Sequence, residues 1–302
     1  MVVGGPTELR RDRARVDRAP RHRGVSPTDK FTATFVALGE LAIRGAKVST
    51  SVSELRTGLS LVAIDDRIVL PTASVGKVLL LIEVAARIVE GASTELEILD
   101  KESVPPIADS GVWQFLQAPS LPIVDVAALV GASSDNLATN VLLQHLGLDS
   151  VRQRAESIGL GRTALLDMVR DERGPDDAPQ LSVGSTAELA WLFGALARGQ
   201  VVDAAVSQRV LDWLSLGTDL SLVASAFGLD PLAHRQVDHD IQVINKTGTD
   251  AGVRSEAGVL FGPRTAVAYA VTVQFSDDSL QARLAVLHAM RIIGHDLLEY
   301  VH

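Results

Sequence analysis

Ser74 and Lys77 have the residue types and the spacing of a nucleophile and its base. They begin and end the run Ser-Val-Gly-Lys, which continues into an apolar stretch over residues 78–82. Because residues three apart share a helix face, the amine would lie beside the hydroxyl. Burial in an apolar helix lowers the pKa of an amine, which allows it to take the serine proton. Free N–H groups at a helix N-terminus could then stabilise an oxyanion.

The same two residues also have a purely structural interpretation. Ser74 could be an ordinary helix N-cap, and Lys77 could lay its stem along apolar surface with its amine in water. A serine followed three residues later by a lysine occurs by chance about once in a chain of this size. The pair therefore needs support from other motifs.

A second motif, Ser134-Asp135-Asn136, lies just before an expected helix. Here a hydroxyl can relay a proton and the Asn136 amide can bind a substrate amide. These three residue types are also the usual helix N-caps, so the motif has a structural interpretation as well.

A third motif, Lys246-Thr247-Gly248, lies at the end of an expected strand. A lysine and a hydroxyl at a strand edge suit a substrate carboxylate, and glycine permits close backbone approach. The chain has only five lysines, and two of them occupy motif positions. The three motifs in this order are unlike a chance arrangement, and together they are typical of enzymes that acylate a serine.

The elements that must position these residues follow from the periodicity of apolar residues and from turn residues. We expect strands near both ends of the chain and helices between them. Strands are predicted over 48–55, 59–64, 67–70, 241–246, 255–261 and 266–275, and helices over 31–45, 75–90, 137–146, 186–198, 207–215 and 279–300.

This order predicts an α+β fold in which an antiparallel five-stranded sheet is flanked by helices, with an inserted all-α domain. We place the sheet domain at residues 31–73 and 233–302 and the all-α domain at residues 74–232. Residues 1–30 are predicted to be a disordered, arginine-rich tail.

With these motifs, residues 31–302 resemble the class A serine β-lactamases and their penicillin-binding relatives. The resemblance includes motif order, approximate spacing and the segment 109–112, which is similar to the loop that precedes the second motif in that family. It implies that Ser74 is the acylated nucleophile and Lys77 its activating partner. Ser134 would pass the proton to the leaving nitrogen.

The resemblance also implies binding roles. Asn136 would bind the amide of the substrate side chain, and Lys246 and Thr247 would hold its carboxylate, with Gly248 allowing close approach. The backbone N–H groups of Ser74 and Thr249 would form the oxyanion hole.

Two departures from the family pattern affect the expected activity. The family's E-x-x-L-N segment, whose glutamate activates the deacylating water, is absent from the loop 166–175. Glu172 is the nearest candidate for this base and Asp171 the next, although a charged loop residue is usually exposed. Asp250 stands where a small residue is usual in the family, and its negative charge should weaken the binding of anionic substrates.

Three functions remain open at this point. The first is a β-lactamase-like serine hydrolase that acts through an acyl-enzyme on β-lactams or related amides and esters. The second is an enzyme similar to D-Ala-D-Ala peptidases or esterases, in which deacylation is slow. The third is a catalytically silent binding protein on the same fold.

Composition excludes several other classes. With no cysteine, thiol catalysis and Cys-ligated metals are excluded, and the seven histidines form no metal-spaced pair. No nucleotide-binding glycine motif is present, so we expect no cofactor. The net charge is −9 overall, and residues 31–302 carry most of the acidity, which argues against nucleic acid as a partner. A small-molecule substrate is expected.

The arginines of the tail are not followed by an apolar segment of ~7–15 residues, so we expect no signal peptide. A cytoplasmic location would follow, although relatives in the resembled family usually work outside the cytoplasm. The longest apolar stretch, 78–89, is interrupted by Glu83 and Arg87 and is too short for a membrane span.

Overall fold

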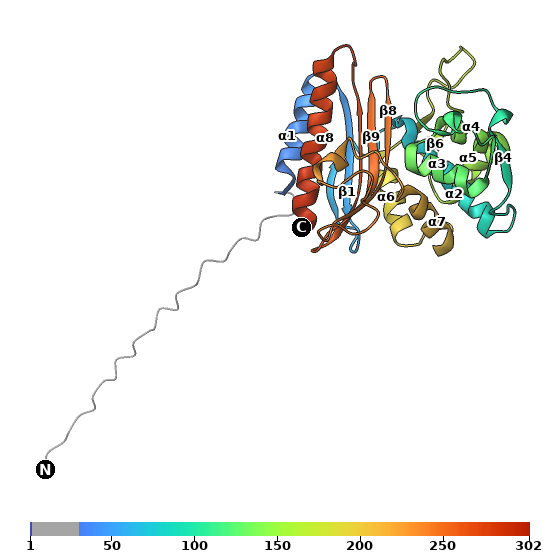
Figure 1. Ribbon diagram of the computed structural model, residues 1–302. Helices are drawn as coiled ribbons and strands as arrows, with labels where there is room; N and C mark the ends of the chain where they lie inside the picture. Colours follow the sequence, from blue (N-terminus) through green and yellow to red (C-terminus); the bar gives the residue numbers. More distant parts are fainter. Residues whose placement is uncertain (2–29) are drawn as a thin grey trace.

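The computed structural model describes Met1 and residues 30–302 (Figure 1), so the expected tail lies almost wholly outside the described residues. The fold is the α+β arrangement expected, with an antiparallel five-stranded sheet between helices. The strands lie in the order β2 (Ser60–Ile64), β1 (Lys47–Glu54), β10 (Ala266–Gln274), β9 (Val253–Phe261) and β8 (Gln242–Asp250).

Pairing of β1 with β10 joins the two ends of the chain. Lys47 lies opposite Gln274, and the register continues without a break to Glu54 opposite Val267. β8, β9 and β10 form a meander, and β8 is left as an edge strand. This edge is where the third motif lies.

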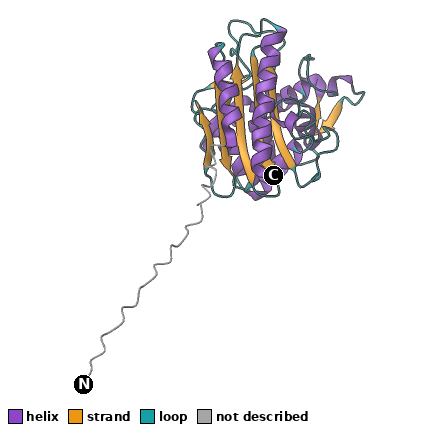
Figure 2. Ribbon diagram, turned by 90° about the vertical axis from the view of Figure 1, so that its left-hand side faces the viewer, coloured by secondary structure: helices purple, strands orange, loops and turns teal. Residues whose placement is uncertain are grey.

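One face of the sheet is covered by α1 (Thr32–Ile43) and α8 (Leu280–Val301), which lie side by side across it (Figure 2). Alternate residues of β10 point into this core, as expected for a strand with period two. The Asp296 carboxylate of α8 accepts hydrogen bonds at 2.8 Å from both the backbone N–H and the hydroxyl of Thr34, which fastens α1 to α8.

The opposite face of the sheet packs on α6 (Thr186–Ala197) and, beyond it, on the remaining helices (Figure 1). The sheet residues here are small: a Cβ on Gly194 of α6 would lie 3.3 Å from the Cβ of Ala268. Small side chains on both elements let the helix approach the strands closely. This face therefore carries a separate hydrophobic core from the one under α1 and α8.

Helix α2 (Lys77–Val89) is buried almost all round. The helices that surround it are α3 (Ile123–Ser133), α4 (Asn136–Leu146), α5 (Leu148–Ser157) and α7 (Ala204–Leu214). Short strands are β3 (Leu70–Pro71), β4 (Ile98–Asp100), β5 (Ser120–Pro122), β6 (Ala164–Leu165) and β7 (Ser182–Gly184), and short 3₁₀ helices are η2 (Ala73–Gly76), η3 (Lys101–Ser103), η4 (Trp113–Phe115) and η5 (Val223–Ala226).

Several predicted boundaries were wrong. The helix expected from residue 207 begins at Ala204, because Asp203 caps it by accepting a hydrogen bond from the Val206 N–H at 2.8 Å. Of the strand expected over 67–70, only Leu70 lies in a strand, the two-residue β3, and β8 continues past its expected end to Asp250. Helices α3 and α5 were not predicted.

The division of the chain at residues 74 and 232 stays a prediction. In the packing, α6 lies against β10, β9 and β1, and residues 220–227 belong to the core under α1 and α8. Among the described residues, none of the helices combines the length and apolar character needed to cross a membrane.

Candidate active site

The sequence predicted that Ser74 begins an α-helix, but in the structure it lies in a 3₁₀ helix that precedes the α-helix. η2 covers Ala73–Gly76, and Lys77 is the first residue of α2. Ala73 has a positive φ of 47°, an uncommon conformation for a residue with a side chain. Such backbone geometry persists only where surrounding contacts enforce it, and it gathers at functional sites.

The edge strand β8 enforces the position of this turn. A Cβ on Gly248 would lie 2.2 Å from the carbonyl oxygen of Thr72 and 3.0 Å from the backbone nitrogen of Ser74. Only glycine fits such a contact. The glycine of the third motif thus lets the strand lie directly against the serine.

Lys77 is completely buried and donates its hydrogen bonds across the cleft to the second motif. Its Nζ lies 2.6 Å from the Ser134 carbonyl oxygen, 2.7 Å from Asn136 Oδ1 and 3.2 Å from Ser134 Oγ. Burial, together with the nearby positive charge of Lys246, holds the pKa of Lys77 well below its usual range. A neutral amine has two N–H donors and one lone pair, so the carbonyl and amide oxygens can take both donors and leave the lone pair to accept a proton.

Ser134 connects the two lysines. Lys246 Nζ donates to Ser134 Oγ at 3.1 Å and to the carbonyl oxygen of Thr247 at 2.8 Å. Burial lowers the pKa of Lys246 to about 8, with the carboxylates of Asp219 and Glu256 acting in the opposite direction. Ser134 itself has φ 56°, between α3 and α4, which directs its hydroxyl to this point.

Asp135, the middle residue of the second motif, has a structural role. Its carboxylate accepts hydrogen bonds from the Ala138 N–H at the start of α4 and from the N–H groups of Val112 and Trp113, at 2.7–2.9 Å. These bonds fix the loop before η4 against the helix that carries Asn136. The Asn136 amide in turn donates to the Ala108 carbonyl oxygen at 2.9 Å.

Ser74 opens into a pocket of about 420 Å³ between the α-helical part and the end of β8. Asn136 and Thr249 line the same pocket, together with loop residues on both sides. A smaller adjoining pocket of about 260 Å³ contains Ser134, Lys246 and Thr247, and Ser110 lines both. The structure therefore brings together residues of all three motifs around one cleft.

Glu172 does not line either pocket and is exposed. Its loop reaches the Ser74 pocket through other residues, namely Val169, Arg170, Asp171 and Arg173. Asp171, the second candidate base, accepts a hydrogen bond from the Ala108 N–H at 3.0 Å.

Ion pairs hold this loop in shape. Asp167 accepts hydrogen bonds from Arg170 at 2.9 Å and from Arg173 at 2.7 Å, and Arg170 also pairs with Asp177 at 3.0 Å. Burial by itself would raise the pKa of Asp167, but these arginines and the Met168 N–H lower it overall. Both pocket-lining arginines are thus committed to carboxylates of their own loop.

Sequence reasoning missed Asp219. Its Oδ2 accepts a hydrogen bond from Thr247 Oγ1 at 2.6 Å, and it lines the smaller pocket with Lys246. No motif includes this residue and it lies 28 positions before Thr247, so only the fold brings it to the site.

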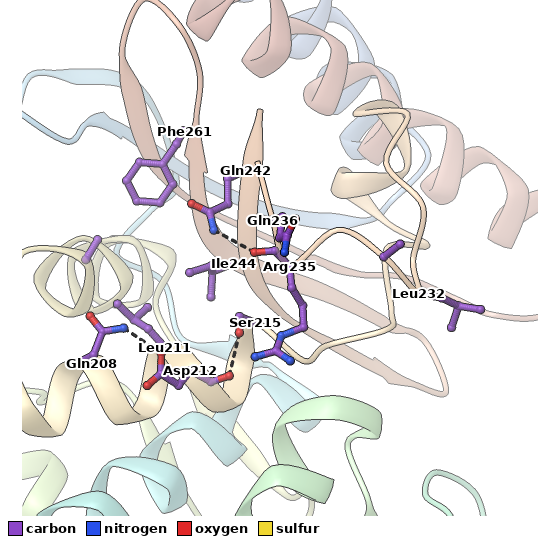
Figure 3. Close-up of a pocket in the computed structure, with 12 residues that line it drawn as sticks. Gln208, Leu211, Asp212, Ser215, Leu232, Arg235, Gln236, Gln242, Ile244 and Phe261 are labelled. Atoms are coloured by element: carbon purple, nitrogen blue, oxygen red, sulfur yellow. Dashed lines mark hydrogen bonds between the residues drawn. The ribbon is translucent and has the colours of Figure 1, made fainter. Parts of the chain in front are cut away.

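A larger groove of about 710 Å³ lies at the other end of β8 (Figure 3). It is bounded by α7 and the segment before β8, with Asp212, Arg235 and Gln242 among its lining residues. It contains none of the motif residues, so size alone does not identify the site with chemistry.

Comparison with solved structures gives the same fold. A β-lactamase from Sphaerobacter thermophilus is 21% identical with a TM-score of 0.74, over 87% of this chain and 95% of that one. An acyl-enzyme complex of a PBP-A mutant with penicillin G is 20% identical with a TM-score of 0.71, over 88% and 96%. A mutant of the class A β-lactamase of the last common ancestor of Gram-negative bacteria is 24% identical with a TM-score of 0.72, over 89% and 98%.

A search among curated proteins gave no match. The family described as the Beta-lactamase enzyme family matches residues 32–301, nearly the whole of the described chain. The chain therefore belongs to the Beta-lactamase enzyme family, on the fold that serine β-lactamases share with penicillin-binding proteins.

Proposed function

We propose that this protein is a serine hydrolase that acylates Ser74 with β-lactams or related amides and esters. The observation that carries this proposal is the convergence of Lys77 and Lys246 on the hydroxyl of Ser134, at 3.2 and 3.1 Å, beside the Ser74 pocket. Lys246 donates to the Ser134 oxygen, and Lys77 gains a third N–H donor once it has taken the Ser74 proton, so it can then pass that proton to Ser134.

In this mechanism, Lys77 removes the proton of the Ser74 hydroxyl as its oxygen bonds to the substrate carbonyl carbon. The backbone N–H groups of Ser74 and Thr249 stabilise the resulting oxyanion. The proton passes through Ser134 to the leaving nitrogen or oxygen as the carbonyl carbon releases it. Asn136 binds the substrate amide, and Lys246, Thr247 and Gly248 line the side of the cleft formed by β8.

Hydrolysis of the acyl-enzyme needs a placed water and a base. The pocket-lining part of the loop offers Val169, two paired arginines and Asp171, whose carboxylate already accepts the Ala108 N–H, instead of a free glutamate. We infer that deacylation is slow, which favours the behaviour of a penicillin-binding enzyme over that of a fast β-lactamase. General-base activation of water typically contributes about 10²–10⁴-fold to such a step.

The competing proposal is a silent binding protein on this fold. Burial of Lys77 argues against it, because an amine removed from water costs free energy that packing with an apolar side chain would not. A catalytically inactive site has no physical need for a buried lysine at this position.

Intact-protein mass spectrometry after mixing with penicillin G or an activated ester tests the proposal. An adduct that is heavier than the protein by one acyl group should form and then decay slowly. The adduct should be absent in Ser74→Ala and present in Ser157→Ala, a control at an exposed serine on α5. An unmodified mass after prolonged exposure to both reagents would refute the proposal.

A further inference from the structure

The hydroxyl of Thr247 is already used within the protein. It donates its single proton to Asp219 Oδ2 at 2.6 Å, while Asp219 Oδ1 accepts the Ser221 N–H at 3.0 Å. A substrate carboxylate placed beside Lys246 would need the same proton. Thr247 can therefore only accept a hydrogen bond from a ligand as long as Asp219 holds it.

Asp219 also brings negative charge into the smaller pocket. Burial would raise its pKa, but hydrogen bonds from Ser221 and Thr247 and the charge of Lys246 bring it below the usual value. The carboxylate is therefore ionised at neutral pH, and its negative charge opposes the positive charge of Lys246. Lys246 has in addition placed two of its donors on Ser134 Oγ and the Thr247 carbonyl oxygen.

A second carboxylate, that of Asp250, lines the neighbouring Ser74 pocket beyond Thr249. The cation nearest to it in the sheet register is Arg254, opposite Thr249. Its guanidinium donates to the carbonyl oxygens of Asp250 and Val253 and lies over the Phe275 ring, so its hydrogen bonds go to backbone oxygens rather than to the Asp250 carboxylate.

From these contacts we infer the substrate class: acyl donors whose leaving group ends in a neutral or cationic hydrogen-bond donor, such as an amide or an ammonium, rather than in a carboxylate. Such a group can donate to Thr247 and to Asp219, whereas a carboxylate would meet an acceptor and a negative charge. This inference rests on the proposed acylation of Ser74.

Three thioesters with the same N-acylglycyl group test it, with mercaptoacetate, mercaptoacetamide and 2-(dimethylamino)ethanethiol, whose tertiary ammonium carries one N–H donor, as leaving groups. In each, the bond from Ser74 Oγ to the acyl carbon forms as the carbon–sulfur bond breaks, and the sulfur leaves with the relayed proton. Thiol release and the acyl-enzyme mass are followed together. Each rate is divided by that probe's rate of hydroxide-catalysed hydrolysis to remove differences in intrinsic reactivity.

The wild type should favour mercaptoacetamide and 2-(dimethylamino)ethanethiol over mercaptoacetate by about tenfold, a modest factor because Asp219 keeps contact with solvent. In Asp219→Asn, the new amide can donate to Thr247 Oγ1 and release the hydroxyl proton. The mercaptoacetate rate should then gain about tenfold relative to mercaptoacetamide. Asp212→Asn, which changes the net charge equally in the groove at the other end of β8, should keep the wild-type ratio.

A wild-type preference for mercaptoacetate, or an unchanged ratio in a folded Asp219→Asn, would overturn this inference and leave the acylation of Ser74 intact. Absence of acylation with all three thioesters would overturn the proposed function and this inference with it. If Asp219→Asn does not fold, the wild-type preference still tests the inference. Asp250→Asn provides a second test, because it should also raise the mercaptoacetate rate relative to the mercaptoacetamide rate.

Discussion

The side chain of Asn140 holds both backbone polar groups of Val169. Its Oδ1 accepts the Val169 N–H at 2.8 Å, and its Nδ2 donates to the Val169 carbonyl oxygen at 2.9 Å. This pair fixes one point of the loop to α4, and Val169 lines the Ser74 pocket. An apolar residue is thus held firmly where a water-activating base could act.

Val169→Glu should therefore shorten the lifetime of the acyl-enzyme, by about 10²-fold if the carboxylate reaches the hydrolytic water. Intact-protein mass spectrometry after mixing and removal of excess penicillin measures that lifetime. Val169→Gln is the matched control, since it has nearly the same size and cannot serve as a base. Equal lifetimes in the two variants would show that this position does not activate water.

Glu172→Gln should leave both the acylation rate and the acyl-enzyme lifetime unchanged. Glu172 is exposed and does not line the Ser74 pocket, so its carboxylate is separated from the ester to be hydrolysed. Single-turnover assays with a chromogenic cephalosporin separate the two steps. A longer lifetime in this variant would restore Glu172 as the base that the sequence suggested.

The motif residues could be placed from the sequence because short spacings fix local geometry. Ser74 and Lys77 are three positions apart, which places them on one helix face, and a glycine at position 248 indicated a close approach. Asp219 and Val169 could not be placed, since their contacts with Thr247 and Asn140 span 28 and 29 residues and depend on how whole elements pack.

Helices α3 and α5 escaped prediction for physical reasons. α3 begins after Pro122 without a side-chain cap, so no capping residue marks its start. α5 is polar over most of its length, and only Val151 and Ala155 are buried, so its apolar repeat is too sparse to identify a helix.

Lys77→Arg should abolish acylation as fully as Lys77→Ala does, with a loss of about 10²–10⁴-fold. Arginine keeps the positive charge but does not release its proton in proteins, so it cannot be a base. The burst of product on mixing with penicillin G measures the effect, and thermal unfolding shows whether each variant folds. A folded Lys77→Arg with near-normal acylation would refute the base role.

Gly248→Ala should reduce acylation more than it reduces stability. Its methyl group would lie 2.2 Å from the Thr72 carbonyl oxygen, so the turn that carries Ser74 must move away from β8. A shift of the nucleophile by about 1 Å can cost about 10²-fold in rate. Gly39→Ala is the control, because nothing lies within 4 Å of its added Cβ in α1 and alanine favours helix. Unchanged acylation in Gly248→Ala would mean that strand and turn are not rigidly coupled.

A buried carboxylate lies behind the third motif. Glu256 on β9 accepts hydrogen bonds from Tyr269 Oη at 2.6 Å, from Asn245 Nδ2 at 2.9 Å and from the Val223 N–H at 2.7 Å. Burial raises the pKa of Glu256 to about 7, although these hydrogen bonds oppose the rise. This side chain links η5 to the strand that carries Lys246.

The raised pKa of Glu256 predicts that the protein loses stability as the pH increases from about 4.5 to above 7. In this window the folded protein keeps a proton that the unfolded chain has released, so the free energy of unfolding falls with pH, by about 3 kcal/mol in total for this rise in pKa. Urea unfolding at pH 5 and pH 8 measures the change. Glu256→Gln has no proton to release, so the difference between the two pH values should shrink by that amount relative to the wild type. An equal pH dependence in both proteins would show that Glu256 ionises in the folded state as easily as in the unfolded chain, with its hydrogen bonds outweighing its burial.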